Sequence, residues 1–182
     1  GWSTYTPSEN GWMWVQAGCS NYSSPCYATV DSKRNFVISG CDAGNTYSSI
    51  FFPVLKNQQV TYYSSSTTST SSYFIKSKEG EYLQLPDWSN AMLKPWYQKL
   101  NAECNGWIYA ECGSSGSQGY IRINDSYDMF ISRQSSDYRC HSSIFIPILN
   151  GEQYYLNHGG FSGVCYFIPC IKQSIIGMPD WS

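Results

Sequence analysis

The stretch Ser48-Ser49-Ile50-Phe51-Phe52-Pro53-Val54-Leu55 returns later in the chain as Ser142-Ser143-Ile144-Phe145-Ile146-Pro147-Ile148-Leu149, at an offset of 94 residues. Each copy is a short run of β-branched and aromatic residues, which is typical of a β-strand. Three further pairs of segments repeat in the same order, with offsets of 93 to 95 residues: Asn10–Trp14 with Asn105–Tyr109, Tyr73–Ile75 with Tyr166–Ile168, and Pro86–Ser89 with Pro179–Ser182. Such self-similarity predicts a tandem duplication.

The offsets divide the chain into two repeats. We expect the first β-sandwich repeat over residues 1–87 and the second over residues 88–182, with a short linker at the start of the second. The linker sequence Pro-Asp-Trp-Ser recurs at residues 179–182, which leaves open a third repeat that begins there. The alternative is a single domain whose strands are similar by coincidence.

Each repeat reads as β structure. Short runs of aromatic and β-branched residues lie between Gly, Ser, Asn and Pro, and they predict strands at Trp12–Gln16, Tyr27–Val30, Phe36–Ser39 and Tyr120–Ile123. The only helix candidate is Asp87–Leu100, which Pro95 interrupts. The predicted fold class is therefore all-β, as two tandem β-sandwich or jelly-roll-like units.

Each repeat also contains a predicted hairpin. Ile50–Leu55 and Val60–Tyr63 are separated by a turn at residues 56–58, and the equivalent pair in the second repeat is separated by Asn150-Gly151. Asn-Gly is a strong hairpin signal because both turn positions then accept positive φ. Pro53 and Pro147 lie inside the strands and cannot donate to a sheet, so we expect them on an edge or at a bulge.

The composition excludes several functional classes. The 182 residues include 11 Lys and Arg against 13 Asp and Glu, for a net charge of −2, so there is no basic surface typical of nucleic-acid binding. No run approaches the 18 apolar residues that mark a membrane-spanning helix, so we expect no membrane insertion. Aromatic residues make up 17% of the chain, which argues for a folded rather than a disordered protein.

Taken together, the repeated segments resemble the modules of bacteriophage tail-fibre and receptor-binding proteins of the gut-phage type. The matching features are the Asn-Gly-Trp opening strand, the Ser48–Tyr63 and Ser142–Leu156 hairpins, the Ser72–Lys76 and Tyr166–Lys172 strands, and the Pro-Asp-Trp-Ser linkers. The linker carries Trp where the family has Tyr. The resemblance implies a virion or other extracellular protein that attaches to a host cell, with copies of itself as partners in a homotrimer.

The eight cysteines do not follow the repeat. Cys19 and Cys26 fall opposite Ser114 and Gly119, so disulfides are not a shared source of stability in the two repeats. In a reducing cytosol the cysteines would remain thiols, whereas a secreted protein would form bridges such as Cys19–Cys26 or Cys165–Cys170. No Cys-x-x-Cys pair is present, so we expect no metal site.

No catalytic signature is apparent. The two histidines, His141 and His158, lie in the second repeat and lack the sequence context of a nucleophile motif. Asp125 and Asp128 are better explained as turn formers than as a glycosidase pair. We therefore expect a protein that is not an enzyme and has no cofactor.

A binding surface is the remaining prediction. Tyr and Trp bury a large area and keep a polar group, and Tyr with Ser, Asn and Gly is the composition of adaptable recognition surfaces. Most aromatics must fill the cores, and we assign Trp12, Trp14, Phe51, Trp107, Phe145 and Phe167 there. The candidate binding residues lie in expected loops or linkers: Tyr22, Tyr47, Trp96, Tyr97, Tyr138 and Phe161.

These features predict a fibre module that attaches to cell-surface glycans or a protein receptor through several weak contacts, which add up by avidity. Two alternatives remain. One is a secreted, monomeric, lectin-like carbohydrate-binding domain, and the other is a purely structural spacer of a fibre or surface filament that binds no glycan.

Overall fold

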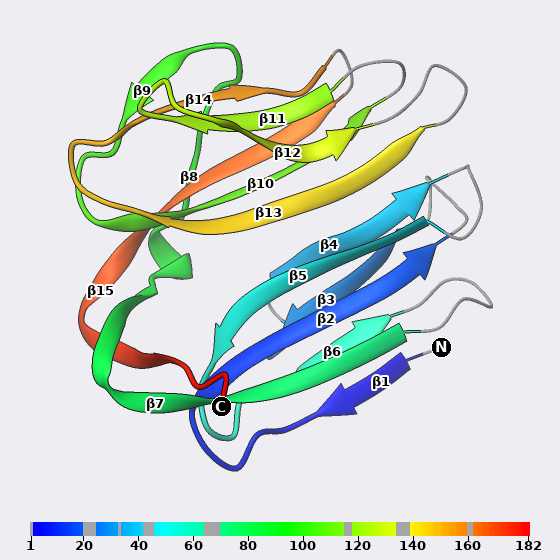
Figure 1. Cartoon of the computed structure of the whole chain (residues 1–182), viewed down its shortest axis with the longest axis vertical. Coiled ribbons are helices and arrows are strands. Elements are labelled where there is room, and N and C mark those ends of the chain that lie inside the picture. The colour runs from blue at the N-terminus through cyan, green and yellow to red at the C-terminus, as the bar shows by residue number, and fades with distance from the viewer. Residues whose placement is uncertain are drawn as a thin grey trace. The chain divides into compact units, whose positions relative to one another are not determined.

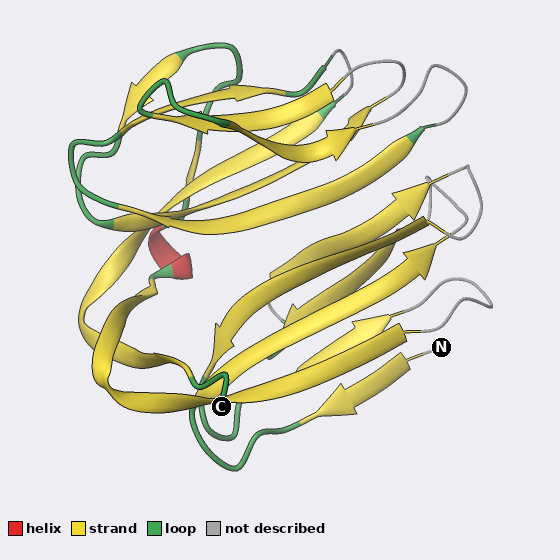
Figure 2. Cartoon of the chain, in the orientation of Figure 1, coloured by secondary structure: helices red, strands yellow, loops and turns green. Residues whose placement is uncertain are grey.

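The computed structural model describes residues 2–19, 25–32, 34–41, 46–63, 70–114, 118–133, 139–159 and 162–182, with the backbone alone at 34, 35, 41, 46, 114 and 133. Within these ranges the chain is almost entirely strand, and its one helical segment is the 3₁₀ turn η1 (Trp88–Asn90) (Figure 2). The predicted all-β class is confirmed.

The chain forms two compact units. Unit 1 comprises Gly1–Leu85 together with Lys172–Ser182, and unit 2 comprises Pro86–Ile171. The expected repeats, residues 1–87 and 88–182, are therefore a different division of the chain from its compact units. The last eleven residues lie within the second expected repeat but belong to unit 1.

Unit 1 has two antiparallel sheets. One contains four strands in the order β1–β6–β3–β4: β1 (Trp2–Tyr5), β6 (Val60–Tyr63), β3 (Cys26–Val30) and β4 (Arg34–Cys41). The other contains β5 (Thr46–Val54), β2 (Gly11–Cys19) and β7 (Thr70–Pro86), with the end of β15 (Gly163–Pro179) beside β7 (Figure 1). Alternate residues of these strands are apolar and buried, and rings such as Phe36 and Phe52 stack 4.8 Å apart in the core.

Unit 2 is built in the same way. Its four-stranded sheet has the order β9–β14–β11–β12: β9 (Lys99–Asn101), β14 (Gln153–Asn157), β11 (Gln118–Ile123) and β12 (Asp128–Arg133). Its second sheet contains β13 (Cys140–Ile148), β10 (Gly106–Ser114), β15 and the short β8 (Met92–Leu93). The core includes Ile108, Ile121, Leu156 and Phe167, all at most 2% exposed.

The central strands of the two units begin in the same manner. β2 lies between β5 and β7 and starts at Gly11, whereas β10 lies between β13 and β15 and starts at Gly106. A Cβ atom on Gly11 would lie 2.5 Å from the Phe74 ring, and one on Gly106 would lie 2.7 Å from the Phe167 ring. Glycine is therefore required at both positions for the ring to reach the strand.

The turn after the repeated strand also has one geometry in both units. In Leu55–Gln58 and in Leu149–Glu152, the last amide donates to the first carbonyl, at 3.0 and 3.1 Å. The third residue has positive φ, 67° at Asn57 and 84° at Gly151, which is the pattern of a type II turn. Glycine and asparagine are the two residue types that favour positive φ at this position of the turn, and each unit has one of them.

An asparagine side chain fixes each of these turns to the start of the central strand. The Asn10 Oδ1 atom accepts from the Lys56 amide, and the Asn105 Oδ1 atom accepts from the Asn150 amide, both at 2.9 Å. The asparagine of the repeated Asn-Gly-Trp segment therefore has a structural role in both units.

The predicted hairpins are wrong, although their strands are present. β5 pairs with β2, whereas β6 pairs with β1 and β3, so the turn carries the chain from one sheet to the other. β13 and β14 are separated in the same way. Pro53 lies on the edge strand β5, as expected from its missing amide hydrogen.

Two further expectations are corrected. The helix candidate Asp87–Leu100 contains only the turn η1 and two short strands, because Asp87 caps a single turn and Pro95 blocks helix continuation. Trp14 was assigned to the core but is 38% exposed, because Met13 and Val15 take the inward positions of β2.

Candidate functional site

The outer face of the four-stranded sheet in unit 1 carries three aromatic side chains in one row. Trp2 in β1 pairs with Tyr63 in β6, and Tyr63 pairs with Tyr27 in β3. Side chains alternate between the faces of a sheet, and the neighbours of Tyr27, Cys26 and Ala28, are fully buried in the core. We call Trp2, Tyr27 and Tyr63 the unit 1 aromatic row.

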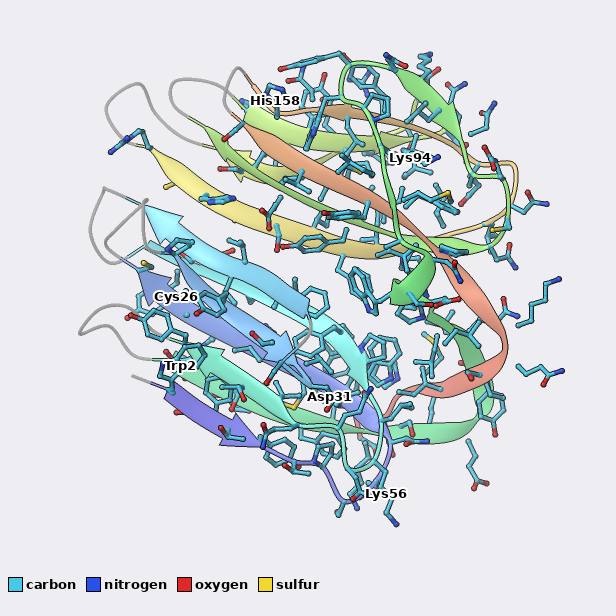
Figure 3. All side chains as sticks on the ribbon, turned by 180° about the vertical axis from the view of Figure 1, so that it is seen from behind. Trp2, Cys26, Asp31, Lys56, Lys94 and His158 are labelled. Carbon is cyan, nitrogen blue, oxygen red and sulfur yellow. The ribbon has the colours of Figure 1, made fainter. Side chains whose placement is uncertain are left out.

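The rings of this row contact one another. The centroids of Trp2 and Tyr63 lie 4.9 Å apart, those of Tyr27 and Tyr63 lie 5.4 Å apart, and the indole stands at 78° to the Tyr27 ring. Trp2 is nevertheless 59% exposed (Figure 3). The neighbouring rings therefore hold the indole in place while much of its surface remains open to a ligand.

Threonines form the next row of the same face. Thr4, Thr61 and Thr29 lie opposite one another in β1, β6 and β3, two residues along each strand from the aromatic row. Their side chains carry hydroxyl groups and no charge. Stacking surfaces and neutral hydrogen-bonding groups therefore lie side by side on this face.

Unit 2 has an aromatic cluster at the corresponding edge of its four-stranded sheet. Tyr97 precedes β9 as Trp2 begins β1, and its amide donates to the Leu156 carbonyl at 2.8 Å. The Tyr97 hydroxyl lies 3.0 Å from the Nδ1 atom of His158, and the two ring centroids are 4.7 Å apart. The Trp96 ring lies 5.1 Å from the same imidazole. We call Trp96, Tyr97 and His158 the unit 2 cluster.

The backbone around this cluster is specialised. Tyr97 has φ of 62°, a left-handed conformation that is unfavourable for a bulky residue and must be held by its surroundings. A Cβ atom on Gly163 would lie 2.6 Å from the Trp96 ring, so glycine allows the indole to lie against β15. Tyr97 itself is 48% exposed. The fold therefore holds an exposed tyrosine in a strained conformation.

His158 is positioned to respond to pH. Partial burial lowers its pKa below the usual value of 6.5, with a smaller opposing effect from a backbone hydrogen bond. The imidazole is therefore neutral at pH 7, and one of its nitrogens can accept a hydrogen bond. Protonation would place a positive charge between the two aromatic rings.

The four-stranded sheet of unit 2 carries ion-paired residues at two of the three positions where unit 1 has threonines, and Tyr155 at the third. Arg122, at the position of Thr29, lies 2.7 Å from Asp128, and its guanidinium is 5.5 Å from the centre of the Tyr120 ring. Lys99 lies 2.6 Å from Asp125. The two units therefore present different chemistry on equivalent faces.

The structure locates three of the six predicted binding residues. It brings Trp96 and Tyr97 together around His158, whereas Tyr47 lies apart in β5, opposite Gly18 and 55% exposed. The other three predicted residues, Tyr22, Tyr138 and Phe161, lie outside the described residues.

The unit 1 aromatic row was not predicted from the sequence, because binding residues were expected in loops, whereas Trp2, Tyr27 and Tyr63 lie in strands. The alternation of Cys26-Tyr27-Ala28-Thr29, with large or polar residues between small ones, was the available signal of an outward-facing tyrosine.

A second group of titratable side chains lies in unit 2. The Tyr109 hydroxyl donates to the Glu111 carboxylate at 2.5 Å, and His141 lies 4.0 Å from the other carboxylate oxygen. Burial lowers the pKa of His141, and the Glu111 charge partly offsets this effect. Within the described ranges, no cluster of three or more His, Cys, Asp or Glu side chains is suited to hold a metal ion.

The cysteines serve mainly as packing residues. The structure holds six as thiols: Cys19, Cys26, Cys104, Cys112, Cys165 and Cys170. The bridges Cys19–Cys26 and Cys165–Cys170 are therefore not formed, whereas Cys140 is disulfide-bonded. Burial raises the pKa of both Cys112 and Cys165 to about 12, so these thiols are not reactive at neutral pH.

No protein-family model, curated protein or solved structure matches this chain. In the part of the chain that the structure describes, no helix has the length and apolar character needed to cross a membrane.

Proposed function

We propose that this protein is a non-enzymatic attachment module that binds cell-surface glycans through exposed aromatic side chains. The observation that carries the proposal is the unit 1 aromatic row, in which Trp2 remains 59% exposed although two tyrosines support it. The apolar face of a sugar ring stacks on such a surface, and the exposed indole supplies the largest area in the row.

The surroundings of the row favour a neutral ligand. The adjacent Thr4 and Thr61 hydroxyls can donate to and accept from sugar hydroxyls. In unit 2 the charges of Arg122 and Lys99 are paired with aspartates. Among the side chains that the structure describes, neither face therefore offers an uncompensated cluster of charge for an anionic polymer.

Two sites in one chain support attachment by avidity. The unit 2 cluster supplies a second exposed aromatic surface around Tyr97. When one polysaccharide engages both sites, the second contact forms at high effective concentration, so weak individual contacts suffice.

We further propose that the chain is a fibre module of a virion or another extracellular particle and assembles as a homotrimer. The resemblance of its repeated segments to phage receptor-binding modules supports this assignment. Equivalent strand registers, turns and glycines in the two units support a tandem duplication of one β-sandwich.

Glycan binding is tested with the full chain on an array of bacterial capsular and O-antigen polysaccharides. We expect binding to at least one neutral polysaccharide, and Trp2→Ala should weaken it about tenfold through loss of stacking area. Trp14→Ala is the matched control, because Trp14 is 38% exposed but lies on the other sheet of unit 1. An equal loss in both variants would contradict a site at Trp2.

Two other functions remain to be separated. The disulfide at Cys140 favours an oxidising compartment and hence a secreted lectin-like domain. Light scattering under reducing and non-reducing conditions distinguishes them: a fibre module should have three times the chain mass of 20.6 kDa, and a secreted domain the mass of one chain. A structural spacer would bind no glycan on the array.

A further inference from the structure

The segment Pro86-Asp87-Trp88-Ser89 docks on unit 2 through a backbone hydrogen bond and ring contacts. The Asp87 amide donates to the Pro169 carbonyl at 2.7 Å. The Trp88 ring stacks on Phe145, with centroids 5.4 Å apart, and Phe145 in turn stacks on Trp107 at 4.8 Å. The segment therefore adds the outermost ring to a stack of three.

The segment Pro179-Asp180-Trp181-Ser182 docks on unit 1 in the same way. The Asp180 amide donates to the Lys76 carbonyl at 2.8 Å. Trp181 stacks on Phe51 at 5.6 Å, and Phe51 stacks on Trp12 at 5.1 Å. Unit 1 thus repeats both the backbone hydrogen bond and the stack of three rings that are found in unit 2.

Each segment is organised by its own side chains. The backbone amide and hydroxyl of Ser89 both donate to Asp87, and those of Ser182 both donate to Asp180. These hydrogen bonds hold the pKa of each aspartate below its usual value, so both are carboxylates at neutral pH. Because these bonds are local, the turn does not depend on which unit receives it.

The residues before Trp181 are also fitted to unit 1. We call Lys172–Ser182 the arm. Ile176 in the arm is 1% exposed, and the Gly177 carbonyl accepts a buried hydrogen bond of 2.8 Å from the Trp12 indole. A Cβ atom on Gly177 would lie 2.0 Å from the Lys78 carbonyl oxygen, so only glycine allows this approach.

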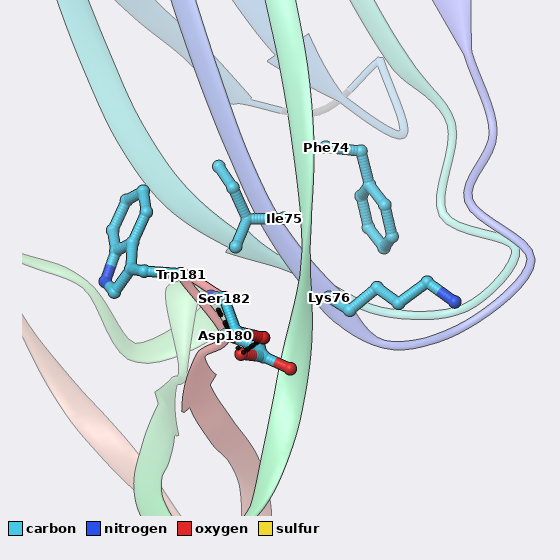
Figure 4. A pocket seen from close by; sticks show the side chains of 6 residues that line it. All are labelled: Phe74, Ile75, Lys76, Asp180, Trp181 and Ser182. Atoms are coloured by element: carbon cyan, nitrogen blue, oxygen red, sulfur yellow. Dashed lines mark hydrogen bonds between the residues drawn. The ribbon is translucent and has the colours of Figure 1, made fainter.

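The end of the arm borders an open pocket of about 350 Å³ on unit 1, lined by Phe74, Ile75, Lys76, Asp180, Trp181 and Ser182 (Figure 4). Trp181 and Asp180 come from the arm and the other side from β7. Trp181 remains 69% exposed, so the arm end is held at an accessible surface of unit 1.

Neither segment docks on the unit that supplies the strand leading into it. β7 belongs to unit 1 as far as Leu85, and the segment after it docks on unit 2. β15 begins in unit 2, and the arm docks on unit 1. This reciprocal exchange is the arrangement of a domain-swapped pair, contained here within one chain.

We propose that unit 1 is a docking site for the arm of a second copy of this chain, so that copies associate by exchanging arms. The intramolecular and exchanged forms make the same contacts and differ only in which copy supplies the arm. A tethered arm competes at an effective concentration in the millimolar range, so exchange is favoured at high protein concentration or when copies fold together. The inference concerns self-association and is independent of glycan binding.

Isotope-mixed cross-linking of the full chain tests this proposal. Equal amounts of unlabelled and ¹⁵N-labelled chain are unfolded, refolded together at high concentration and treated with a carbodiimide, which joins neighbouring amines and carboxylates. The docked arm brings Gly177 against the Lys78 carbonyl and bonds the Asp180 amide to the Lys76 carbonyl, so a cross-link between Lys78 and Asp180 reports on arm docking. Lys76 and Glu9, 2.9 Å apart, are the internal control because both belong to the body of unit 1.

If arms exchange, random pairing predicts that about half of the Lys78–Asp180 cross-links formed between two copies join a light to a heavy peptide. Lys76–Glu9 cross-links form within one copy and should never join peptides of different isotope. Trp181→Ala should lower the light–heavy fraction, and Ile175→Ala, at a half-exposed arm position, should not. Lys78–Asp180 cross-links that are always of one isotope would overturn the proposal. A Lys76–Glu9 cross-link without any Lys78–Asp180 cross-link would overturn it as well, because the arm would then not be docked on unit 1.

Discussion

The two units share their framework and differ on the outer face of the four-stranded sheet. Both fix a type II turn with an asparagine, start the central strand at a glycine under a phenylalanine ring, and receive a Pro-Asp-Trp-Ser segment on a stack of aromatic rings. Across the equivalent faces, unit 1 presents an aromatic row beside threonines, whereas unit 2 presents Tyr120 and Tyr155 beside the ion pairs of Arg122 and Lys99.

This difference separates two roles of the sequence. The shared residues lie where the backbone needs positive φ, a close approach or a buried hydrogen bond, so few other residues fit there. The outer faces carry no such constraint and can diverge. The repeated segments therefore specify the fold, and ligand binding is to be sought among the residues that are not repeated.

One buried position shows how the shared framework accommodates different side chains in the two units. Cys26 in unit 1 corresponds to Gly119 in unit 2, and each directly precedes a β-bulge. A Cβ atom on Gly119 would lie 2.1 Å from the Cys112 sulfur, whereas the residue equivalent to Cys112 in unit 1 is Ala17. At this packing position each unit thus has a single cysteine, Cys26 in the four-stranded sheet of unit 1 and Cys112 in the other sheet of unit 2.

The largest expected effect on stability comes from placing a cysteine on both sheets of unit 2 at this position. Under reducing conditions, which prevent a disulfide with Cys112, Gly119→Cys should destabilise the protein by about 3 kcal/mol, because its Cβ atom would lie only 2.1 Å from the Cys112 sulfur. Thermal unfolding should show a Tm lower by roughly 5–10 °C for a chain of this size.

Adding Cys112→Ala to Gly119→Cys reproduces the unit 1 arrangement and should restore most of the loss. The double variant should unfold within about 1 kcal/mol of the parent, which is strong non-additivity between contacting residues. Equal Tm values for the single and double variants would show that the two units pack differently at this point.

A smaller loss of stability is expected at the two turns in which a side-chain oxygen accepts a hydrogen bond from a strand amide. Asp31 has φ of 49° and accepts from the Gln59 amide at 2.9 Å, and Asn124 has φ of 50° and accepts from the Gln153 amide at 2.9 Å. Asp31→Ala and Asn124→Ala should each cost about 1–2 kcal/mol, since each loses a hydrogen bond and strains the backbone. Denaturant unfolding measures both.

Asp31→Asn is the matched control for these turns, because asparagine occupies the equivalent position in unit 2. It should leave stability almost unchanged. A large loss on Asp31→Asn would mean that unit 1 requires the charge, and the turns would no longer be equivalent.

The smallest expected effect is the contribution of the unit 2 cluster to the pH dependence of folding stability. The pKa of His158 in the folded protein is below the usual 6.5, so the unfolded chain binds more protons and acid favours unfolding. This contribution is fully present above pH 6.5 and is lost as the pH falls through and below that value. Thermal unfolding between pH 7.5 and 5 should show a decrease in Tm that His158→Gln reduces.

His141 acts in the same direction, because burial also lowers its pKa, so part of the acid sensitivity should remain in His158→Gln. An unchanged pH profile in that variant would indicate that His158 is solvated as freely in the folded protein as in the unfolded chain.

The all-β class and most strands could be predicted from the sequence, since short apolar runs between turn residues are a local signal. The pairing of those strands could not. The turn at Asn150-Gly151 looks like a hairpin turn, but only Gly151 has positive φ, and the chain passes to the other sheet. A local turn signal does not state which sheet receives the next strand.

The candidate site was predictable only in part for the same reason. Trp96 and Tyr97 are adjacent in sequence and could be recognised together, but their contact with His158 depends on the fold. The unit 1 aromatic row joins Trp2 to Tyr63 across 61 positions of sequence through strand register. Trp14 was misassigned because both faces of β2 carry apolar residues, so alternation alone did not indicate its outer face.

The most direct test of the account is the number of glycans bound by each chain. Isothermal titration of the full chain with an oligosaccharide of the best-bound polysaccharide should show one site on each unit. Trp2→Ala should remove one site and Tyr97→Ala the other, while Trp14→Ala keeps both. Unchanged stoichiometry and affinity in Trp2→Ala and Tyr97→Ala would contradict the claim that these aromatic surfaces bind the glycan.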